Sequence, residues 1–399
     1  MSNRALKILR NILLVLVLLI VMAGAALTAR LMTGPIQMMW AVPWLERALD
    51  AQGGMAAALD VDDLSLRWNN DARRVEFTAE KVQLTEQNQT LSAVERVGVT
   101  ISTVALLRGR LSIKDITLVA PHLKVNLQRT ENQAGAAPLA LFSGEGNNPI
   151  ARLNSVMIQR GIIELQTHAG EARHVLSGVQ IDWRRKRGKT QAIMNATLQL
   201  AEDPAPRNVH VTLNEDKGNI DLGLHVKDIS PDNIQGILEA LSPGLLSPSL
   251  SLQRLQMPVT LAMNIGLTAD GALRKVSGTA SSDTGHVIVP ELYDIAVPVE
   301  NFSVTGNYDA ATGAWEISDL KAALLDEDAP IPITATATHD PQNAALRFHV
   351  TLGNVNASAL KRWWPPTAAP GGYIWVKEFI HQGNVANSDF AMALKKGAN

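Results

Sequence analysis

The sequence contains no cysteine, few aromatic residues and no strong excess of either charge. Without cysteine, the 399-residue chain cannot form disulfides, thiolate zinc sites or iron–sulfur clusters. Its formal net charge is -2, so no basic field indicates a nucleic-acid-binding protein. Apolar residues make up 46% of the chain and aromatic residues 4%. The chain is therefore too apolar to be disordered, yet it has few large rings to fill a closed core.

One long uncharged segment lies near the N-terminus. Residues 11–29 carry no charge, and at about 1.5 Å per residue they would span roughly 28 Å, which is close to the thickness of bilayer hydrocarbon. Basic residues precede the segment and only Arg30 follows it closely, which predicts a cytoplasmic N-terminus. A cleaved signal peptide is the alternative, because Ala23-Gly24-Ala25 suits a signal peptidase. The predicted anchor consists of Ile12, Leu13, Leu14, Val15, Leu16, Val17, Leu18, Leu19, Ile20, Val21 and Met22.

Beyond residue 59, apolar and polar residues alternate in many short runs. Leu64, Leu66 and Trp68, for example, are separated by polar residues. A period of two predicts antiparallel strands with one apolar and one polar face. The runs lie at residues 64–68, 75–80, 111–114, 123–128, 156–165, 179–183, 192–200, 209–213, 220–226, 259–267, 287–289, 302–308, 331–338, 345–352 and 388–394.

Helical signals are few. A short helix is predicted over residues 44–51, and a second over 231–241, where Ser230 is the N-cap and Pro231 follows it. A third is predicted over 373–382, with Gly383 placed to end it. Because helical signals are few and alternating runs are many, the sequence predicts a mainly β fold. In this fold an N-terminal transmembrane helix is followed by an elongated, curled antiparallel sheet that is repeat-like and forms a groove. The predicted regions are a tip and anchor (1–30), a β region with a short leading helix (31–130), a loop (131–149) and a continuing β-groove (150–399).

The apolar strand faces are predicted to line a trough that matches an extended acyl chain. The parity of residues that faces this trough stays open. The residues selected as lining it are Val75, Phe77, Leu111, Ile113, Leu123, Val125, Leu127, Leu198 and Leu200. One basic run, Arg184, Arg185, Lys186 and Arg187, precedes Gly188 and predicts a hairpin tip, which is either solvated or in contact with anionic lipid headgroups.

No motif for catalysis or metal binding is present. The histidines lack ligand spacing, and the nucleophile elbow, the P-loop and the dinucleotide-binding turn are missing. Asp326-Glu327-Asp328 is interpreted as a solvated turn and not as a calcium site. Trp363-Trp364-Pro365-Pro366 is either a recognition element or a packing plug. We therefore expect no cofactor, no metal and no enzymatic activity.

The order of these motifs resembles AsmA-like proteins, in the YhdP-type branch. The similarity covers nearly the whole chain, from the anchor through the strand–tryptophan–proline–helix–glycine block near the C-terminus. The segments that carry it are Trp44–Ala51, Leu64–Trp68, Val75–Phe77, Leu106–Ile113, Ile116–Val125, Val304–Asp309, Leu360–Pro365, Trp375–Val376 and His381–Val385.

The resemblance implies a single-pass inner-membrane protein of Gram-negative bacteria whose bulk lies in the periplasm. It implies a β-groove that conducts phospholipid between the inner and outer membranes and supports the outer-membrane barrier. Relatives of this type continue further than Asn399, so the chain is expected to be incomplete at its C-terminus. The predicted partners are phospholipids, the inner membrane and envelope proteins, but not nucleic acid. The alternative function is a non-enzymatic assembly or tethering factor for outer-membrane biogenesis that carries no lipid.

Overall fold

The structure is a computed structural model whose described residues are mainly strands with few helices, as the alternation predicted. These residues are 22, 29–30, 33–42, 57–69, 74–86, 89–101, 113–126, 153–166, 173–200, 203, 205–235, 252–269, 271–290, 292–342, 345–365 and 370–395. Within these ranges, no helix combines the length and the apolar character needed to cross a bilayer. The predicted anchor lies outside them apart from Met22, as do the predicted helix at 44–51 and the predicted loop at 131–149.

The chain forms two compact units. The first consists of residues 1–125, 144–164 and 178–185, and the second of residues 126–143, 165–177 and 186–399. Strands β7 and β8 have residues in both units.

The first unit contains an antiparallel ladder in the order β1-β3-β4-β5-β6, with β2 also paired to β4. Leu66, Phe77 and Val99 lie directly opposite one another on one face of this ladder. The strands are β1 (Ile36–Gln37), β2 (Ala57–Asp60), β3 (Asp63–Asn69), β4 (Arg74–Glu86), β5 (Gln89–Ile101), β6 (Ile113–Asn126), β7 (Ser155–Gln166) and β8 (Arg173–Lys186), and a 3₁₀ helix, η1, spans Met39–Ala41.

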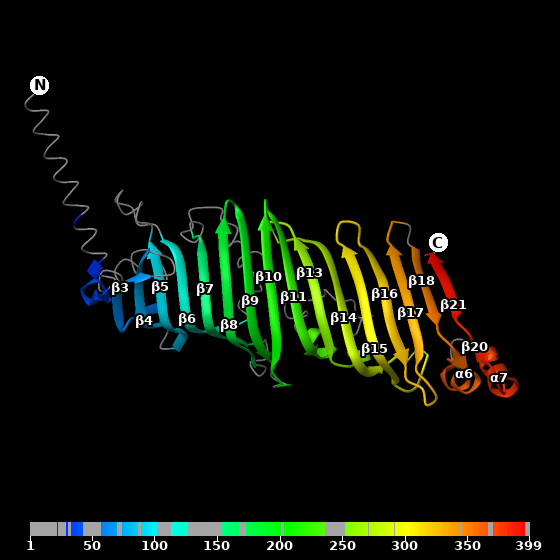
Figure 1. The fold of residues 1–399 in the computed structure, drawn as a ribbon. Helices are drawn as coiled ribbons and strands as arrows, with labels where there is room; N and C mark the ends of the chain where they lie inside the picture. Colours follow the sequence, from blue (N-terminus) through cyan, green and yellow to red (C-terminus); the bar gives the residue numbers. More distant parts are fainter. Residues whose placement is uncertain are drawn as a thin grey trace, which may run out of the picture. The chain divides into compact units, whose positions relative to one another are not determined.

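The second unit contains a longer antiparallel ladder in the order β9-β10-β11-β13-β14-β15-β16-β17-β18-β21. The strands of this ladder lie side by side in the order in which they follow one another along the chain (Figure 1). Its elements are β9 (Lys189–Gln199), β10 (Arg207–Asp216), β11 (Asn219–Ile229), η4 (Leu252–Arg254), β12 (Leu255–Gln256), β13 (Val259–Leu267), β14 (Leu273–Val287), β15 (Val297–Asp309), β16 (Ala314–Leu324), β17 (Ile331–Asp340), β18 (Ala345–Leu352), β19 (Val355–Asn356), α6 (Ala357–Trp363), α7 (Pro370–Phe379), β20 (Asn384–Val385) and β21 (Ser388–Lys395).

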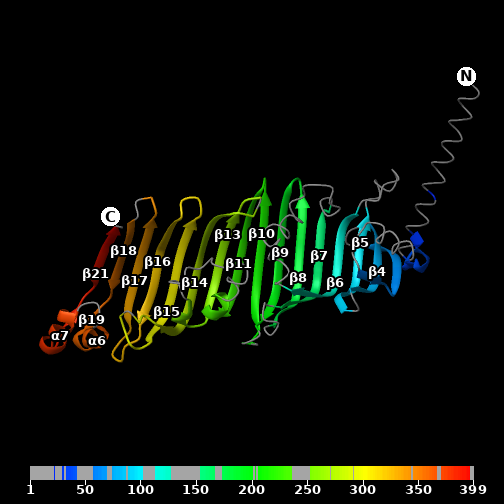
Figure 2. The ribbon, with the colours of Figure 1, turned by 180° about the vertical axis from the view of Figure 1, so that it is seen from behind.

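Because the strands of the second unit are antiparallel, successive connections lie alternately at one end of the strands and at the other. We call these two ends of the sheet the tight-turn edge and the long-connection edge. The tight-turn edge has short connections, at residues 217–218, 268–272, 310–313 and 341–344. At Lys217 and Gly218, φ is 52° and 81°, the left-handed pair that a two-residue type I′ hairpin requires. The long-connection edge has residues 200–206, 230–258, 288–296, 325–330 and 353–387. Both views show α6 and α7 at this edge, below β18 and β21 (Figure 1 and Figure 2).

Among the long strands, β5 and β16 were not predicted and β14 was predicted only at one end, and each departs from simple alternation; the short strands β1, β2, β12, β19 and β20 were not predicted either. Strand β14 carries small residues where its neighbours carry large apolar ones, so only its end at 287 was recognised. In β16 a register shift between Ile317 and Leu320 breaks the period of two. Strand β5 places Val94 and Val97 three residues apart, which also breaks the pattern. The predicted helix at 373–382 exists as α7 but begins and ends three residues earlier.

Candidate functional site

One face of the second unit's sheet is apolar from β11 to β21. The registers bring apolar or side-chain-free residues of neighbouring strands directly opposite one another. The central row is Leu224, Met263, Gly278, Gly306, Ile317, Ala337, Phe348 and Met392. These residues are only half-buried, and Met392 is 52% exposed. If a second layer of the chain were packed over this row, the side chains would be fully buried. Because they are only half-buried, the centre of the apolar face is accessible.

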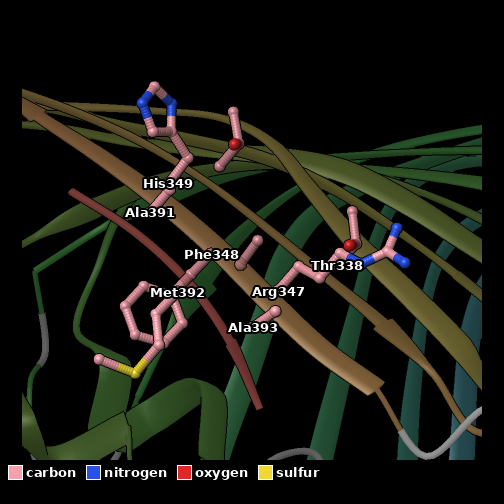
Figure 3. A pocket seen from close by; sticks show the side chains of 9 residues that line it. Thr338, Arg347, Phe348, His349, Ala391, Met392 and Ala393 are labelled. Atoms are coloured by element: carbon pink, nitrogen blue, oxygen red, sulfur yellow. The ribbon is translucent and has the colours of Figure 1, made fainter. Parts of the chain in front are cut away.

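The opposite face is polar, as the alternation predicted. Figure 3 shows Phe348 and Met392 on one side of the sheet and His349 on the other. Threonines at 334, 336 and 338 lie on the polar face of β17. A shallow hollow of about 360 Å³ lies over β17, β18 and β21 near Arg347 and His349. His210 occupies a strand position, as expected, and its Nδ1 lies 2.7 Å from Asn195 Oδ1.

At the long-connection edge the apolar face is closed by a buried cluster, which we call the α6 cluster. Helix α6 contributes Ala359, and Leu360 and Trp363 pack against the cluster. Tyr293 meets Trp363 edge-on with ring centroids 6.2 Å apart, and its hydroxyl donates to the Trp363 carbonyl at 2.7 Å. Burial raises the pKa of Tyr293. The buried members are Met257, Val259, Val297, Val299, Leu324, Ile331, Val355 and Ala359. Trp363 therefore has the packing role, one of its two predicted alternatives.

Helix α6 is held in place by the acidic segment 326–328. Asp326 accepts hydrogen bonds from Arg362 Nη1 at 2.6 Å and from the Trp363 indole at 2.9 Å, and its side chain is 1% exposed. Asp328 accepts from Asn356 Nδ2 and Ser358 Oγ, which lowers the pKa of its carboxyl group. The interpretation of Asp326 as part of a solvated turn is therefore wrong. Its partners lie about 35 residues away in the sequence, so no local signal could have identified them.

Two of the residues predicted to line a groove lie in a second buried cluster. Leu198 and Leu200 are 7% and 3% exposed, and they pack with Val209, Val226 and Ile229. Ile234 packs against this cluster; residues 231–235 are helical, and the rest of the helix predicted at 231–241 lies outside the described residues. Ser230 caps that helix as predicted, because its hydroxyl accepts from the Asn233 amide at 3.4 Å. The side chains of Leu198 and Leu200 are therefore away from the half-buried centre of the apolar face.

The other predicted lining residues belong to the first unit. Val75 and Phe77 in β4, and Ile113 and Leu123 in β6, are half-buried. Leu111 and Leu127 lie outside the described residues, and the side chain of Val125 does as well. The first unit does not contribute to the central row of the second.

The opposite face of the first unit buries polar residues. The Glu76 side chain is 2% exposed, and its Oε2 accepts from Arg67 Nε and Nη2 at 3.2 and 3.1 Å and from Asn69 Nδ2 at 2.9 Å. Thr78 and Thr100 are also buried. Gly98 lies directly against Glu76 Oε1, and a Cβ atom there would clash with it. The alternation of apolar and polar residues indicated which residues lie together on this face. It did not indicate that the face is buried by other parts of the protein.

The basic run ends at a hairpin turn, as predicted. Strand β8 ends at Lys186, Arg187 and Gly188 form the turn, and β9 begins at Lys189. Arg184 binds Asp182 at 2.7 Å, and the Arg185 guanidinium lies 5.2 Å from the centre of the Trp183 ring. Lys186 and Arg187 are exposed, which fits either of the predicted roles.

In the part of the chain that the structure describes, no group of three or more histidine, aspartate or glutamate side chains could hold a metal ion. The protein was compared with family models, with curated proteins and with solved structures, and none of them matches this chain.

Proposed function

We propose that the apolar face of the second unit covers the acyl chains of phospholipid, and that the protein conducts phospholipid between the inner and outer membranes of a Gram-negative envelope. The observation that carries the proposal is the half-buried central row, which crosses strands from β11 to β21 without a polar side chain. A continuous apolar surface holds hydrocarbon without directional bonds. A lipid can therefore slide from strand to strand while its headgroup stays in water.

The magnitude of the hydrophobic effect supports this proposal. Burying one methylene group is favourable by about 0.8 kcal/mol, so an acyl chain crossing the periplasm needs a cover. The groove, its curl and the inner-membrane anchor are parts of the proposal, and so is the place of the chain in the YhdP-type branch. The same proposal assigns the protein a transport role and no chemical step.

Photo-crosslinking in cells tests the proposal with two neighbouring positions of β13. Met263 lies on the apolar face and Asn264 on the polar face. A photoreactive residue at Met263 is expected to label phospholipid, and one at Asn264 is expected not to. Equal labelling at the two positions, or none at Met263, would rule the proposal out.

A second candidate function is tethering or assembly without lipid transport, and strand β21 favours it. Among the described strands, β21 pairs only with β18, so its other edge can accept a strand from a partner. Phe390 and Met392 are more than half exposed on it. Purification of the full chain in mild detergent distinguishes the two functions, because envelope proteins without phospholipid would favour tethering.

A further inference from the structure

The burial of the apolar face changes along its strands. On β15, Val297 and Val299 are buried as members of the α6 cluster, Phe302 and Val304 are half-buried, and Tyr308 is exposed. Strands β13, β16 and β17 are likewise buried at Val259, Leu324 and Ile331, and their apolar faces become half-buried toward the tight-turn edge. Outside this group, Ile220 in β11 and Ala345 in β18 are buried near the tight-turn edge. Across β13 to β17, therefore, the face is closed at one edge and accessible toward the other.

Three amphipathic rings lie in a row on this face at the tight-turn edge. Trp315 is directly opposite Tyr308 on one side and His339 on the other. The rings of Trp315 and His339 stack with centroids 5.8 Å apart and an interplanar angle of 7°. The His339 Nδ1 atom is buried and makes no hydrogen bond to the described residues. Such rings are found where one end of the side chain meets apolar material and the other meets water.

Among the residues that the structure describes, the strand positions between this aromatic row and the α6 cluster on the apolar face carry no charged side chain. On β15 it extends from Phe302 to Tyr308, about 20 Å at about 3.3 Å per residue. Val304 and Gly306 lie between them on the same face. The length and the boundary of this strip suit an acyl chain that lies along the strands.

We infer that a lipid on this face is oriented, with its headgroup at the Tyr308–Trp315–His339 row and the methyl ends of its acyl chains against the α6 cluster. The inference rests on the proposed function and adds a direction to it. The methyl ends contact Phe302, Ile333 and Leu360, which pack on the closed edge. The ester and phosphate groups lie beside Tyr308, which is exposed and carries a polar hydroxyl group.

Position-specific lipid probes test this orientation on the full chain. One phospholipid carries a diazirine at the terminal carbon of an acyl chain, and the other carries it next to the ester. We expect the terminal probe to label Phe302, Leu320 and Ile333, and the ester-proximal probe to label Tyr308, Trp315 and Leu346, as mapped by mass spectrometry. Uniform or inverted labelling would overturn the orientation and leave the proposed function intact. No labelling of the apolar face by either probe would overturn both.

A pair of variants on β17 tests the same point through chain length. Ala335 lies on the apolar strip opposite Leu320, and Thr336 lies next to it on the polar face. Ala335→Phe is expected to weaken binding of long-chain phospholipid more than that of short-chain phospholipid, because the ring obstructs only the deep part of the strip. Thr336→Phe is expected to change neither, and circular dichroism confirms that both variants fold. An equal loss for both chain lengths in Ala335→Phe would contradict the orientation.

Discussion

The two units use the same antiparallel alternation but bury different faces of it. In the first unit the fully buried side chains of β4 are Glu76 and Thr78, while Val75 and Phe77 between them are half-buried. In the second unit two aliphatic clusters are buried toward the long-connection edge. The alternation of apolar and polar residues in a strand therefore does not determine which face of the strand becomes buried. The segments that pack on the sheet decide that.

The two units also differ in the interactions that stabilise their sheets. The first unit buries a carboxylate that accepts three hydrogen bonds, beside apolar residues such as Val179 and Trp183, and removal of the carboxylate would leave its donors without that acceptor. The second unit depends on apolar burial beneath helix α6, whose polar contacts lie at its rim. Four variants test this contrast, beginning with the one from which we expect the largest effect.

Glu76→Ala is expected to destabilise the first unit by about 3 kcal/mol, because it removes a buried carboxylate that accepts three hydrogen bonds from Arg67 and Asn69. The measurement is the urea midpoint of the full chain, with hydrogen exchange in β3 and β4 to locate the effect. Glu76→Gln keeps the shape and an accepting oxygen, so its loss should be smaller. A change below about 0.5 kcal/mol in Glu76→Ala, the range of ordinary surface substitutions, would mean that the polar face does not stabilise the first unit.

Trp363→Ala is expected to destabilise the second unit by about 2 to 3 kcal/mol, because it opens a space beneath α6 and removes the hydrogen bond to Asp326. Hydrogen exchange in α6 and β17 measures the effect. Trp375 in α7 is 57% exposed and provides the matched control. If Trp375→Ala cost as much as Trp363→Ala, the α6 cluster would not be the source of the stability.

Thr78→Val is expected to stabilise the first unit by about 1 kcal/mol, because the Thr78 hydroxyl is buried without a hydrogen bond in the described structure and valine has nearly the same shape. Thermal unfolding measures the change. Thr100→Val, at another buried position of the same face, is the comparison. A loss of stability in Thr78→Val would show that the hydroxyl has a partner and that this face is more polar than described.

The attachment of α6 is expected to weaken in acid. The hydrogen bonds from Ser358 and Asn356 lower the pKa of Asp328 below its ordinary value of 3.8. A lowered pKa in the folded state adds stability above the unfolded-state value, and that stability disappears as the pH falls through the folded-state value. The difference in melting temperature between wild type and Asp328→Asn should therefore be largest near neutral pH and vanish in strong acid. A difference that does not change with pH would contradict the role of the carboxylate.

Local patterns predicted most of the long strands and the turn that joins β8 to β9. Leu64 to Trp68 and the run at 331–338 alternate cleanly, and both are strands. Arg187-Gly188 and Lys217-Gly218 have the residue types of two-residue turns and adopt left-handed backbone angles. Strand β16 was missed because its register shift places Ile317 and Leu320 three residues apart on the same face. Twist and bulges depend on the neighbouring strands, so the isolated sequence carries only part of that information.

The candidate site was predicted less completely than the fold. Leu198 and Leu200 were selected as lining a groove, but their side chains belong to a buried cluster against which Ile234 packs. The aromatic row was not predicted, because its three members are separated by 7 and 24 residues in the sequence and meet only through the register of β15, β16 and β17. The contacts of Asp326 with α6 were missed for the same reason.

By itself, the sequence determined that the chain forms many strands with one apolar and one polar face, which residues of most of these strands share a face, and that a turn follows the basic run, because each of these depends on neighbours one to four residues apart. Only the tertiary structure decided which face is covered, where the apolar face is closed and which rings stand together at its open edge. Those features depend on contacts between residues tens of positions apart, whose free energy is realised only when the strands have paired and the long connections have packed against them.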